Sequence, residues 1–427
     1  MSLKERILNL ILSKSNSYKF YKENYELLLN KNKELKTHEI SNLENKINRQ
    51  QDYINIIQGR LDNISNDLIK ISDLKNKKIA YVLYSFPVHS ETFVVNEIKW
   101  LKEHNYDVTV FKWQDSDKPV NLDFQVKTIK FDDESQLEKL LVENEIDFIH
   151  THFVYPMCTN FTYVVAEKLK IPFTVFAHAV DIFARVNDKR NKVKEISESK
   201  FCKAVFTLSE FHKNYLIERG VDERKIIITK QATGYELENI KISDNKIKNI
   251  VSVSRFVEKK GLDVLINAAK ILENENYEFS IYGFGDLKDD LQNQIDELNC
   301  NNISIKGELP PNEVKNILKE ADLLVSPCKI AENGDMDGFP TVIFEAMAVG
   351  LPILTTKVSA IPEIIKDGEN GFITEPENPE LFAKKINEIS KISNEELFEI
   401  RKKAQDDVKN ISSVENTMTT FVNVVES

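Results

Sequence analysis

Two carboxylates frame a predicted helix start in the second half of the chain. Asp337 and Glu345 lie eight positions apart, with the turn Gly338–Pro340 between them. Pro340 suits the first helical position because it has no N–H group to lose there, and Gly350 marks the predicted end of the helix. A helix start offers free backbone N–H groups and the positive end of a dipole, so this segment favours an anionic ligand.

The predicted helix is apolar on nearly every side. The exceptions are Thr341 and Glu345, which lie one helical turn apart and form a polar stripe. Side chains lean toward the N-terminus of a helix, so Glu345 leans toward the same end as the predicted anion site. A carboxylate on an otherwise buried helix needs a partner, and a ligand that carries phosphate and hydroxyl groups would supply one.

Basic residues follow a predicted strand at 249–254. Arg255 and Lys260 lie in the loop between this strand and the next helix, at the strand end where ligands bind in sheets of this kind. An arginine can hold phosphate with a fork of N–H groups, and a lysine adds a point charge. Gly283 and Gly285 follow another strand of the same half. This short pair predicts a tight turn beside a base or a ribose, since a dinucleotide fingerprint needs a third glycine.

A D-x-D metal site is an alternative for Asp335 and Asp337, because such carboxylates can bind Mg²⁺ or Mn²⁺. We disfavour it, since these residues lead directly into the helix start that suits phosphate. No metal cofactor is expected.

A third group of polar residues follows strands of the first half. His178 comes directly after a predicted strand at 173–177, and His152 lies at the end of a strand at 147–153. The imidazole of His178 could donate a hydrogen bond to a sugar hydroxyl or stabilise developing charge, and a structural role is the alternative. Ser90, Glu91 and Thr92 follow the first strand and could contact an acceptor, although Ser90 would serve equally as a helix N-cap.

From Lys77 onward, short buried strands alternate with helices. The strands are predicted at 78–86, 108–113, 147–153, 173–177, 204–209 and 226–230, and then at 249–254, 277–283, 303–306, 323–326 and 353–356. This alternation predicts an α/β protein with two Rossmann-like, doubly wound domains. We place the first domain at 77–240, the second at 241–408, and a last helix at 409–427 that packs back toward the first domain. Ligands are expected in the cleft where the strand C-terminal ends face each other.

Residues 1–76 differ from the rest and contain no proline. Ten positions from Ile40 to Ile71 follow alternating steps of three and four, and all but Gln50 are apolar. The pattern predicts a long α-helical coiled coil that associates in parallel, with Gln50 available to fix its register. A single helix packed on its own globular domain is the alternative.

Apolar and basic residues cluster within the first 25 positions. Leu3, Ile7 and Leu10 are interleaved with Lys4 and Arg6. Such a face can lie on an anionic membrane surface. The alternative is that this segment only continues the helical bundle.

Bulk composition limits the function classes. The net charge of -11 argues against nucleic acid as a partner. The four cysteines are far apart and form no C-x-x-C pair, which favours reduced thiols. No apolar run approaches the ~20 residues of a membrane span, and the start does not read as a signal peptide. We therefore expect a cytoplasmic protein, peripheral on the inner face of the cytoplasmic membrane.

Taken together, these motifs resemble those of the family 4 retaining glycosyltransferases, which have the two-domain GT-B fold. The family carries a Glu, seven residues and a second Glu, and the matching segment here runs from Asp337 to Glu345 and continues as AMAVGLPIL. The likeness extends from about Lys77 to the C-terminus and is most specific in the second half. Ser90–Phe93 with Asn96 and Glu97, Ala177–Ala179 and Asp337–Pro340 look like the subgroup that builds bacterial exopolysaccharides such as colanic acid.

The resemblance implies a role for each residue in holding a nucleotide-diphosphate sugar. Arg255 and Lys260 would hold the diphosphate, and Glu345 would bind the ribose hydroxyls. Asp337 would contact the donor sugar, with backbone N–H groups after Gly338, and His178 would lie beside the reacting centre. Asp337 departs from the commoner Glu, and its shorter arm changes the sugar contact.

The predicted site thus comprises catalytic, donor-binding and acceptor-side residues. The catalytic set is His178, Asp337, Arg255 and Lys260. The donor-binding set is Arg255, Lys260, Gly283, Gly338, Phe339, Pro340, Thr341 and Glu345. The acceptor-side set is Ser90, Glu91, Thr92 and His152.

The resemblance implies a retaining glycosyltransferase of bacterial surface polysaccharide synthesis. It would move a sugar from a nucleotide-diphosphate donor, UDP favoured over GDP, to a saccharide or lipid-linked saccharide acceptor. One alternative is a catalytically inactive GT-B-like scaffold that its coiled coil assembles into a homo-oligomer. Another is a sugar-nucleotide epimerase of the GT-B type.

Overall fold

The computed structural model describes residues 19–20, 22–24, 26–27, 45–49, 51, 77–88, 91–116, 121–242 and 246–426. The chain divides into two units near residue 75. The described residues of the first unit are helical. Apart from them, the predicted coiled coil at 40–71 and the predicted membrane-contact segment at 1–25 lie outside the described residues and stay predictions.

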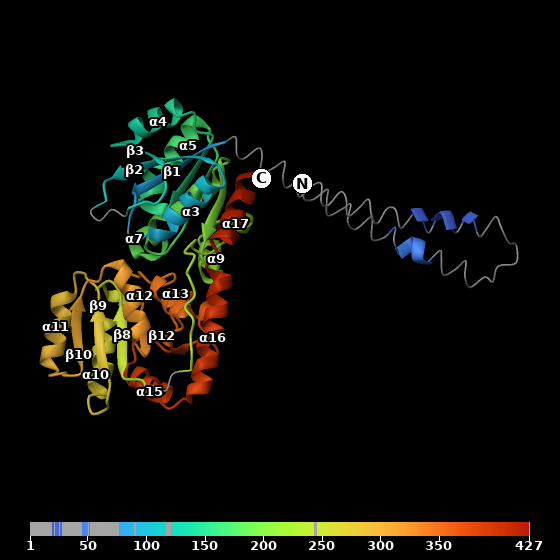
Figure 1. Ribbon diagram of the computed structural model, residues 1–427. Helices are drawn as coiled ribbons and strands as arrows, with labels where there is room; N and C mark the ends of the chain where they lie inside the picture. Colours follow the sequence, from blue (N-terminus) through green and yellow to red (C-terminus); the bar gives the residue numbers. More distant parts are fainter. Residues whose placement is uncertain are drawn as a thin grey trace. The chain divides into compact units, whose positions relative to one another are not determined.

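The second unit begins with a sheet of seven parallel strands (Figure 1). In chain order they are β1 (Lys78–Ser85), β2 (Asp107–Gln114), β3 (Lys127–Lys130), β4 (Phe148–His152), β5 (Phe173–Phe176), β6 (Cys202–Thr207) and β7 (Ile226–Ile228). Their order in the sheet is β3-β2-β1-β4-β5-β6-β7. Six were predicted. The missed strand β3 is a largely exposed edge strand, so it lacks the apolar run by which the others were found.

Helices connect these strands. They are α3 (Thr92–Glu103), α4 (Glu134–Glu143), the π-helical turn η2 (Val154–Thr162), α5 (Tyr163–Leu169), α6 (Val180–Phe183), α7 (Arg185–Arg190), α8 (Lys192–Glu198), α9 (Glu210–Glu218) and the 3-10 turn η3 (Glu223–Lys225). The short helices α6, α7 and α8 were not predicted, since none is long enough to show a helical period.

A second parallel sheet follows a linker without secondary structure in its described residues. Its strands are β8 (Asn249–Val253), β9 (Glu278–Tyr282), β10 (Ile303–Gly307), β11 (Leu323–Ser326), β12 (Ile353–Thr356) and β13 (Phe372–Thr374), in the order β10-β9-β8-β11-β12-β13. Its helices are the 3-10 turn η4 (Glu258–Lys260), α10 (Leu262–Ile271), α11 (Lys288–Glu297), α12 (Pro311–Glu320), α13 (Thr341–Val349), α14 (Ile361–Ile364) and α15 (Pro379–Ile389). The prediction of two Rossmann-like domains is confirmed.

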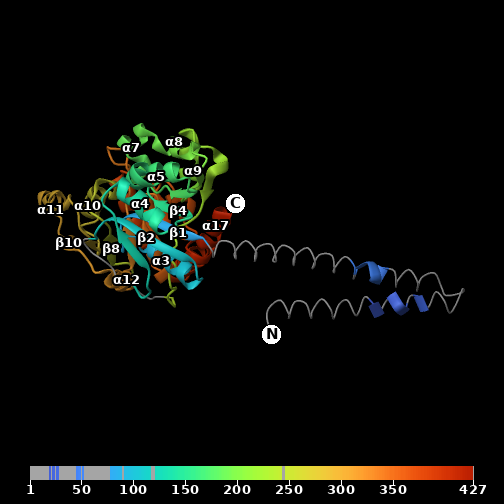
Figure 2. The same cartoon turned by 90° about the horizontal axis from the view of Figure 1, so that it is seen from above.

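Each sheet reverses its strand order at one place. In the first sheet β1 lies between β2 and β4, and in the second β8 lies between β9 and β11; Figure 2 labels β2, β1 and β4 next to one another. Connections leave such a reversal point in opposite directions, so the strand C-terminal ends there form a natural ligand site. The loops after β1, β4, β8 and β11 are therefore the places to look for chemistry.

The chain ends in two long helices, α16 (Asn394–Ile411) and α17 (Val414–Glu426). Helix α17 packs against the first sheet and its helices (Figure 1). The ring of Phe421 lies 4.9 Å from that of His150, and the Thr417 hydroxyl donates to the carbonyl of Lys230 at 2.9 Å. Among the described helices, none is long and apolar enough to cross a lipid bilayer.

Gly261 lets the loop after β8 approach the loop after β11. Its φ is +62°, and a Cβ atom there would lie 1.9 Å from the carbonyl oxygen of Pro327. Only glycine fits, because any side chain would collide with backbone. This close approach matters, since Lys260 precedes Gly261 and Asp337 follows Pro327 by ten positions.

We expect Gly261→Ala to lower the free energy of unfolding by about 3 kcal/mol, because the new methyl group must displace the Pro327 backbone. Gly368→Ala is the matched control. Gly368 also has a positive φ, +76°, but nothing lies within 4 Å of a Cβ atom there, so only the backbone cost of about 1 kcal/mol applies. Urea unfolding followed by circular dichroism measures both, and equal losses would contradict the close approach.

Candidate active site

A buried ion pair joins the loops after β8 and β11. The Lys260 Nζ lies 2.5 Å from the Asp337 Oδ2, and Asp337 is 7% exposed. Burial alone would raise the pKa of Asp337, but the charges of Lys260 and Lys259 outweigh it and lower that pKa to about 2. Burial likewise works to lower the pKa of Lys260, yet the charge of Asp337 prevails and raises it. Both groups are therefore ionised at neutral pH.

Lys259 is a member of this cluster that the sequence did not reveal. Its Nζ lies 3.0 Å from the Asp335 Oδ2 and 3.4 Å from the Asp337 Oδ1, and the residue is buried. Two adjacent lysines in a loop are typical of solvated residues. Only the two nearby carboxylates, Asp335 and Asp337, could have suggested that each lysine has an acidic partner. Asp335 therefore takes part in an ion-pair cluster with lysine.

Arg255 and the paired glycines complete the donor side of the predicted site. Arg255 is exposed, and it lies close enough for its charge to act on the pKa of Lys260. Gly283 has a φ of +143°, and a Cβ atom there would lie 1.8 Å from the carbonyl oxygen of Ser254. The loop after β9 therefore packs closely against the backbone of Ser254 and fixes the position of the backbone that leads into Arg255.

Helix α13 begins at Thr341 and ends at Val349, with Gly350 in the left-handed conformation. Pro340 precedes the helix as its N-cap, because its ψ of 117° is extended, so it lies one position earlier than predicted. Within α13 only Thr341 and Glu345 are not fully buried, which confirms the polar stripe.

Glu345 has neither a hydrogen bond nor an ion pair to any described residue. Burial raises its pKa to about 7. It lines an open cavity of about 180 Å³ with Tyr235 and Lys315. A carboxylate with this pKa can change its charge near neutral pH when a hydrogen-bond donor arrives.

Residues after Asp337 meet the first sheet. A Cβ atom on Gly338 would lie 2.9 Å from the His212 Nε2, and the Lys230 Nζ lies 4.6 Å above the ring of Phe339. The carboxylate of Glu363 on α14 accepts from the backbone N–H groups of Glu210, at 3.1 Å, and Phe211, at 2.8 Å. Glu363 thus caps α9 across the two sheets.

On the first sheet, His178 belongs to a chain of buried side chains. Its Nε2 lies 3.0 Å from the Nδ1 of His152, and the Nε2 of His152 lies 3.0 Å from the Oε2 of Glu97. Burial, with the nearby His152 and His212, holds the pKa of His178 well below its usual value, so the ring is neutral. Both histidines were singled out from the sequence, whereas Glu97, in the middle of α3, entered only as part of the family resemblance and was assigned no role.

The other acceptor-side predictions are less well defined. Ser90 lies outside the described residues. Glu91 is partly buried beside His152, and burial raises its pKa. Thr92 begins α3 and is exposed, so it is placed at the predicted loop without a contact that assigns it a role.

Glu97, His150 and His152 are the described residues grouped closely enough to hold a metal ion, with ligand atoms within 4.8 Å of one another. Each of them also has hydrogen-bond partners. The Nδ1 of His150 lies 2.8 Å from the Thr174 hydroxyl, and its Nε2 lies 3.3 Å from the Nε2 of His152.

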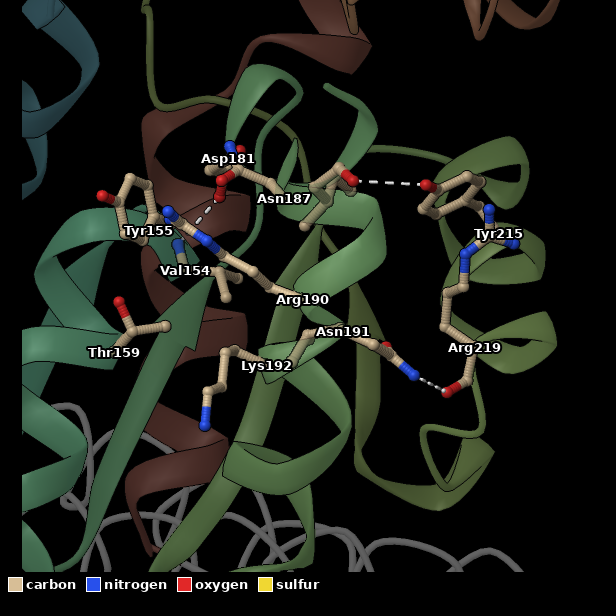
Figure 3. A pocket seen from close by; sticks show the side chains of 12 residues that line it. Val154, Tyr155, Thr159, Asp181, Asn187, Arg190, Asn191, Lys192, Tyr215 and Arg219 are labelled. Atoms are coloured by element: carbon tan, nitrogen blue, oxygen red, sulfur yellow. Dashed lines mark hydrogen bonds between the residues drawn. The ribbon is translucent and has the colours of Figure 1, made fainter. Parts of the chain in front are cut away.

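A pocket of about 10 Å³ lies on the first sheet's side, between η2 and helices α6 to α9. The guanidinium of Arg190 lies 4.3 Å above the ring of Tyr155 and pairs with no acid among the described residues (Figure 3). Asn187 and Asn191 use their amide nitrogens on backbone carbonyls, which leaves both amide oxygens buried without a partner. The pocket is therefore lined by a cation without an acidic partner in the described part of the chain and by two asparagines whose amide oxygens are buried.

Two family models match the chain. Residues 90–230 match Glycosyltransferase Family 4, and residues 236–407 match Glycosyl transferases group 1. The first segment covers most of the first sheet and the second covers the whole second sheet. The two models thus meet at the linker.

The chain is similar in sequence to two glycosyltransferases of bacterial polysaccharide synthesis. The chain is 27% identical over 353 residues to the amylovoran biosynthesis glycosyltransferase AmsK of Erwinia amylovora, covering 69% of this chain and 86% of that protein. It is 23% identical over 390 residues to the putative colanic acid biosynthesis glycosyltransferase WcaL of Escherichia coli K12, covering 78% of this chain and 95% of that protein.

Solved structures share the fold. Anabaena Alr3699/HepE in complex with UDP and glucose superposes with a TM-score of 0.66 at 17% identity, over 82% of this chain and 99% of that one. A glycosyltransferase from Rickettsia africae superposes with a TM-score of 0.64 at 19% identity, over 82% of this chain and 98% of that one. These likenesses confirm the GT-B arrangement of the two sheets.

We expect Lys260→Met to lower the free energy of unfolding by about 3 kcal/mol at pH 7, because it leaves the buried Asp337 carboxylate short of its nearer cation. Asp337→Asn should cost a similar amount, and the double variant should recover most of the loss. Because the pKa of Asp337 lies below its unfolded value, this contribution is present above pH 4 and fades as the pH falls toward 2.

The neighbouring pair of Lys329 and Asp263 is the control. Their charged atoms lie 2.8 Å apart, but the Asp263 side chain is 45% exposed, so Lys329→Met should cost less than about 1 kcal/mol. Urea unfolding of the four variants provides the measurement. Strictly additive losses in the Lys260 and Asp337 cycle would show that the pair is not coupled.

Proposed function

Because the chain carries a Glycosyltransferase Family 4 domain followed by a Glycosyl transferases group 1 domain, we propose that it is a retaining glycosyltransferase that uses a nucleotide-diphosphate sugar. The observation that carries the proposal is the meeting of Lys260, Asp337 and the start of α13 on one sheet. These groups offer positive charge, a carboxylate and a helix N-terminus, which suit a diphosphate bonded to a sugar.

The donor lies, in this proposal, against the second sheet. Arg255 and Lys260 neutralise the diphosphate, and Glu345 accepts hydrogen bonds from the ribose hydroxyls. Asp337 is released from Lys260 as the diphosphate arrives and takes the sugar hydroxyls instead. We favour UDP over GDP, and the UDP bound in the structurally similar Alr3699/HepE supports this choice.

The chemistry follows from charge placement. The bond between the anomeric carbon and the diphosphate oxygen breaks, and the acceptor hydroxyl attacks from the same face, so the configuration is kept. The proton of the acceptor passes to the departing diphosphate. Arg255, Lys260 and the N-terminus of α13 stabilise the negative charge that develops there, which is the role a metal ion plays in other transferases.

The acceptor lies against the first sheet. The guanidinium of Arg190, exposed above the ring of Tyr155, would pair with an anionic group of the acceptor. A saccharide bearing phosphate or carboxylate, free or linked to a lipid diphosphate, has such a group. The names of the AmsK and WcaL relatives support a role in bacterial polysaccharide synthesis.

The first test is donor binding and turnover with a panel of UDP- and GDP-sugars. Release of free sugar or transfer product from the nucleotide supports a transferase, whereas an epimerized sugar still on its nucleotide would point to an epimerase. Failure of every donor to bind would leave the inactive scaffold. Lys260→Ala and Glu345→Ala should each lower turnover by tenfold or more, roughly the loss of one charge-assisted hydrogen bond.

Donor affinity should depend on pH through Glu345. With its pKa near 7 in the free protein, the side chain is protonated below that pH and cannot accept from both ribose hydroxyls. The affinity for UDP-glucose should therefore fall as the pH is lowered from 8 to 6, by up to about tenfold per unit below 7. Calorimetry at these pH values measures it.

Glu345→Gln is the control for this titration, because its amide cannot ionise. The variant should bind more weakly at pH 8 and show a flat profile. Asp337 stays ionised over the same range, since its pKa is about 2. An unchanged slope in Glu345→Gln would assign the titration to another group.

The acceptor assignment is tested with glucose 1-phosphate as a probe, in the presence of saturating UDP so that the donor side is filled. We expect binding of glucose 1-phosphate but not of glucose, and about tenfold weaker binding in Arg190→Gln. Lys189→Gln, a neighbouring exposed cation that does not line the pocket, should bind as the wild type does. Equal losses in both variants would indicate a diffuse electrostatic effect.

A further inference from the structure

The hydrogen-bonded series Glu97, His152 and His178 indicates which ring nitrogens carry protons. Glu97 on α3, His152 on β4 and His178 after β5 are linked by two contacts of 3.0 Å. All three are buried, at 3%, 0% and 5% exposure. Because no water competes in such a place, each contact must join one donor to one acceptor.

The direction of donation is set at the Glu97 end. An ionised carboxylate only accepts hydrogen bonds, and two donors converge on the same oxygen of Glu97. The Tyr81 hydroxyl lies 3.2 Å from the Oε2, and the Nε2 of His152 lies 3.0 Å from it. The Nε2 of His152 therefore carries the proton.

The rest of the chain follows from the valence of a neutral imidazole, which has one N–H group. His152 lies between the rings of Phe93 and Phe176, both with centroids at 5.4 Å. With its proton on Nε2, its Nδ1 is an acceptor. The Nε2 of His178 must then donate to it, which leaves the Nδ1 of His178 with a lone pair.

That nitrogen is available to a ligand. The Nδ1 of His178 has no hydrogen-bond partner within the described part of the chain. His178 stands at the C-terminal end of β5, where ligands of a parallel sheet bind. A lone pair there would accept from a hydroxyl, whereas the sequence alone suggested a donor.

We propose that Glu97, acting through His152, is a positioning residue that holds His178 as the Nε2–H tautomer, so that its Nδ1 accepts a hydrogen bond from a hydroxyl of the donor sugar. The sugar contact rests on the proposed function, but the tautomer does not. A protonated His152 would reverse the outcome, because His178 would then carry its proton on Nδ1.

The experiment reads ring nitrogens directly by NMR of full-length protein labelled with ¹⁵N-histidine. The seven histidines give separate patterns, and the pattern absent from His178→Gln assigns His178. We expect a protonated Nε2 and an unprotonated Nδ1 without any ligand. A proton on Nδ1, or on both nitrogens, overturns the proposal.

Two variants test the origin of the tautomer. Glu97→Leu removes the acceptor and should convert His178 to a mixture of tautomers, with about tenfold weaker binding of UDP-glucose, the loss of one hydrogen bond. Tyr81→Phe removes the other donor to Glu97 and should leave the His178 pattern unchanged. If Glu97→Leu does not fold, Glu97→Gln replaces it. Its amide oxygen can still accept, so the tautomer should persist, and a reversal would overturn the chain.

Two further measurements separate this proposal from its rivals. Zinc at one equivalent in the purified protein, lost in Glu97→Leu, would show that Glu97, His150 and His152 are metal ligands and would overturn the hydrogen-bonded chain. Addition of UDP-glucose should shift the Nδ1 of His178 alone. If UDP-glucose binds without that shift, the sugar contact is wrong. If no nucleotide sugar binds while the tautomer is as expected, the proposed function fails and the proton assignment stands.

Discussion

The ion pair between Lys260 and Asp337 is the contact on which the second sheet's site depends. It joins loops that leave the two strands at the reversal point, and it forms only because Gly261 lets those loops touch. A buried pair of this kind adds little net stability by itself, since removing two charges from water is costly. Its effect is on geometry. Moving either side chain away would leave the other as an unpaired buried charge, which is costly, so the pair keeps both groups in place.

The site on the first sheet is built from hydrogen bonds between buried side chains, whereas the site on the second sheet is built on an ion pair. His178, His152 and Glu97 form a buried hydrogen-bonded chain, and burial lowers the pKa of His178 and of His150, which keeps both rings neutral. The two halves therefore differ in kind. The second sheet presents a buried ion pair, and the first presents a pattern of hydrogen-bond donors and acceptors.

The sequence predicted those parts of the site whose spacing is local. The turn before α13, its polar stripe and the basic loop after β8 could each be read from a few consecutive residues. Lys259 could not, because nothing in a pair of adjacent lysines tells which one is buried. Glu97 was assigned no role, and Arg190 was missed, for other reasons. The partners of Glu97 lie on strands far away in sequence, and Arg190 lies on α7, a helix too short to show a period.

The fold was more accessible than the site because the alternation of buried strands and helices is repeated many times, so local errors average out. Strand β3 was missed because an exposed edge has no apolar signal. The linker was recognised by the lack of pattern. Contacts across the two sheets, such as that of Glu363, have no local signature at all.

The carboxylate of Glu363 on α14 accepts hydrogen bonds from the first turn of α9, and this contact affects the charge that the molecule presents to solvent. Helix α9 has its own N-cap, Ser209, and Glu363 adds acceptors for the N–H groups of Glu210 and Phe211. Loss of the Glu363 contact would uncover these two N–H groups at a positive helix end. An open molecule would thus display an anion-attracting surface that a closed one conceals. The same contact that joins the two sheets thus also conceals part of the positive charge of a helix end.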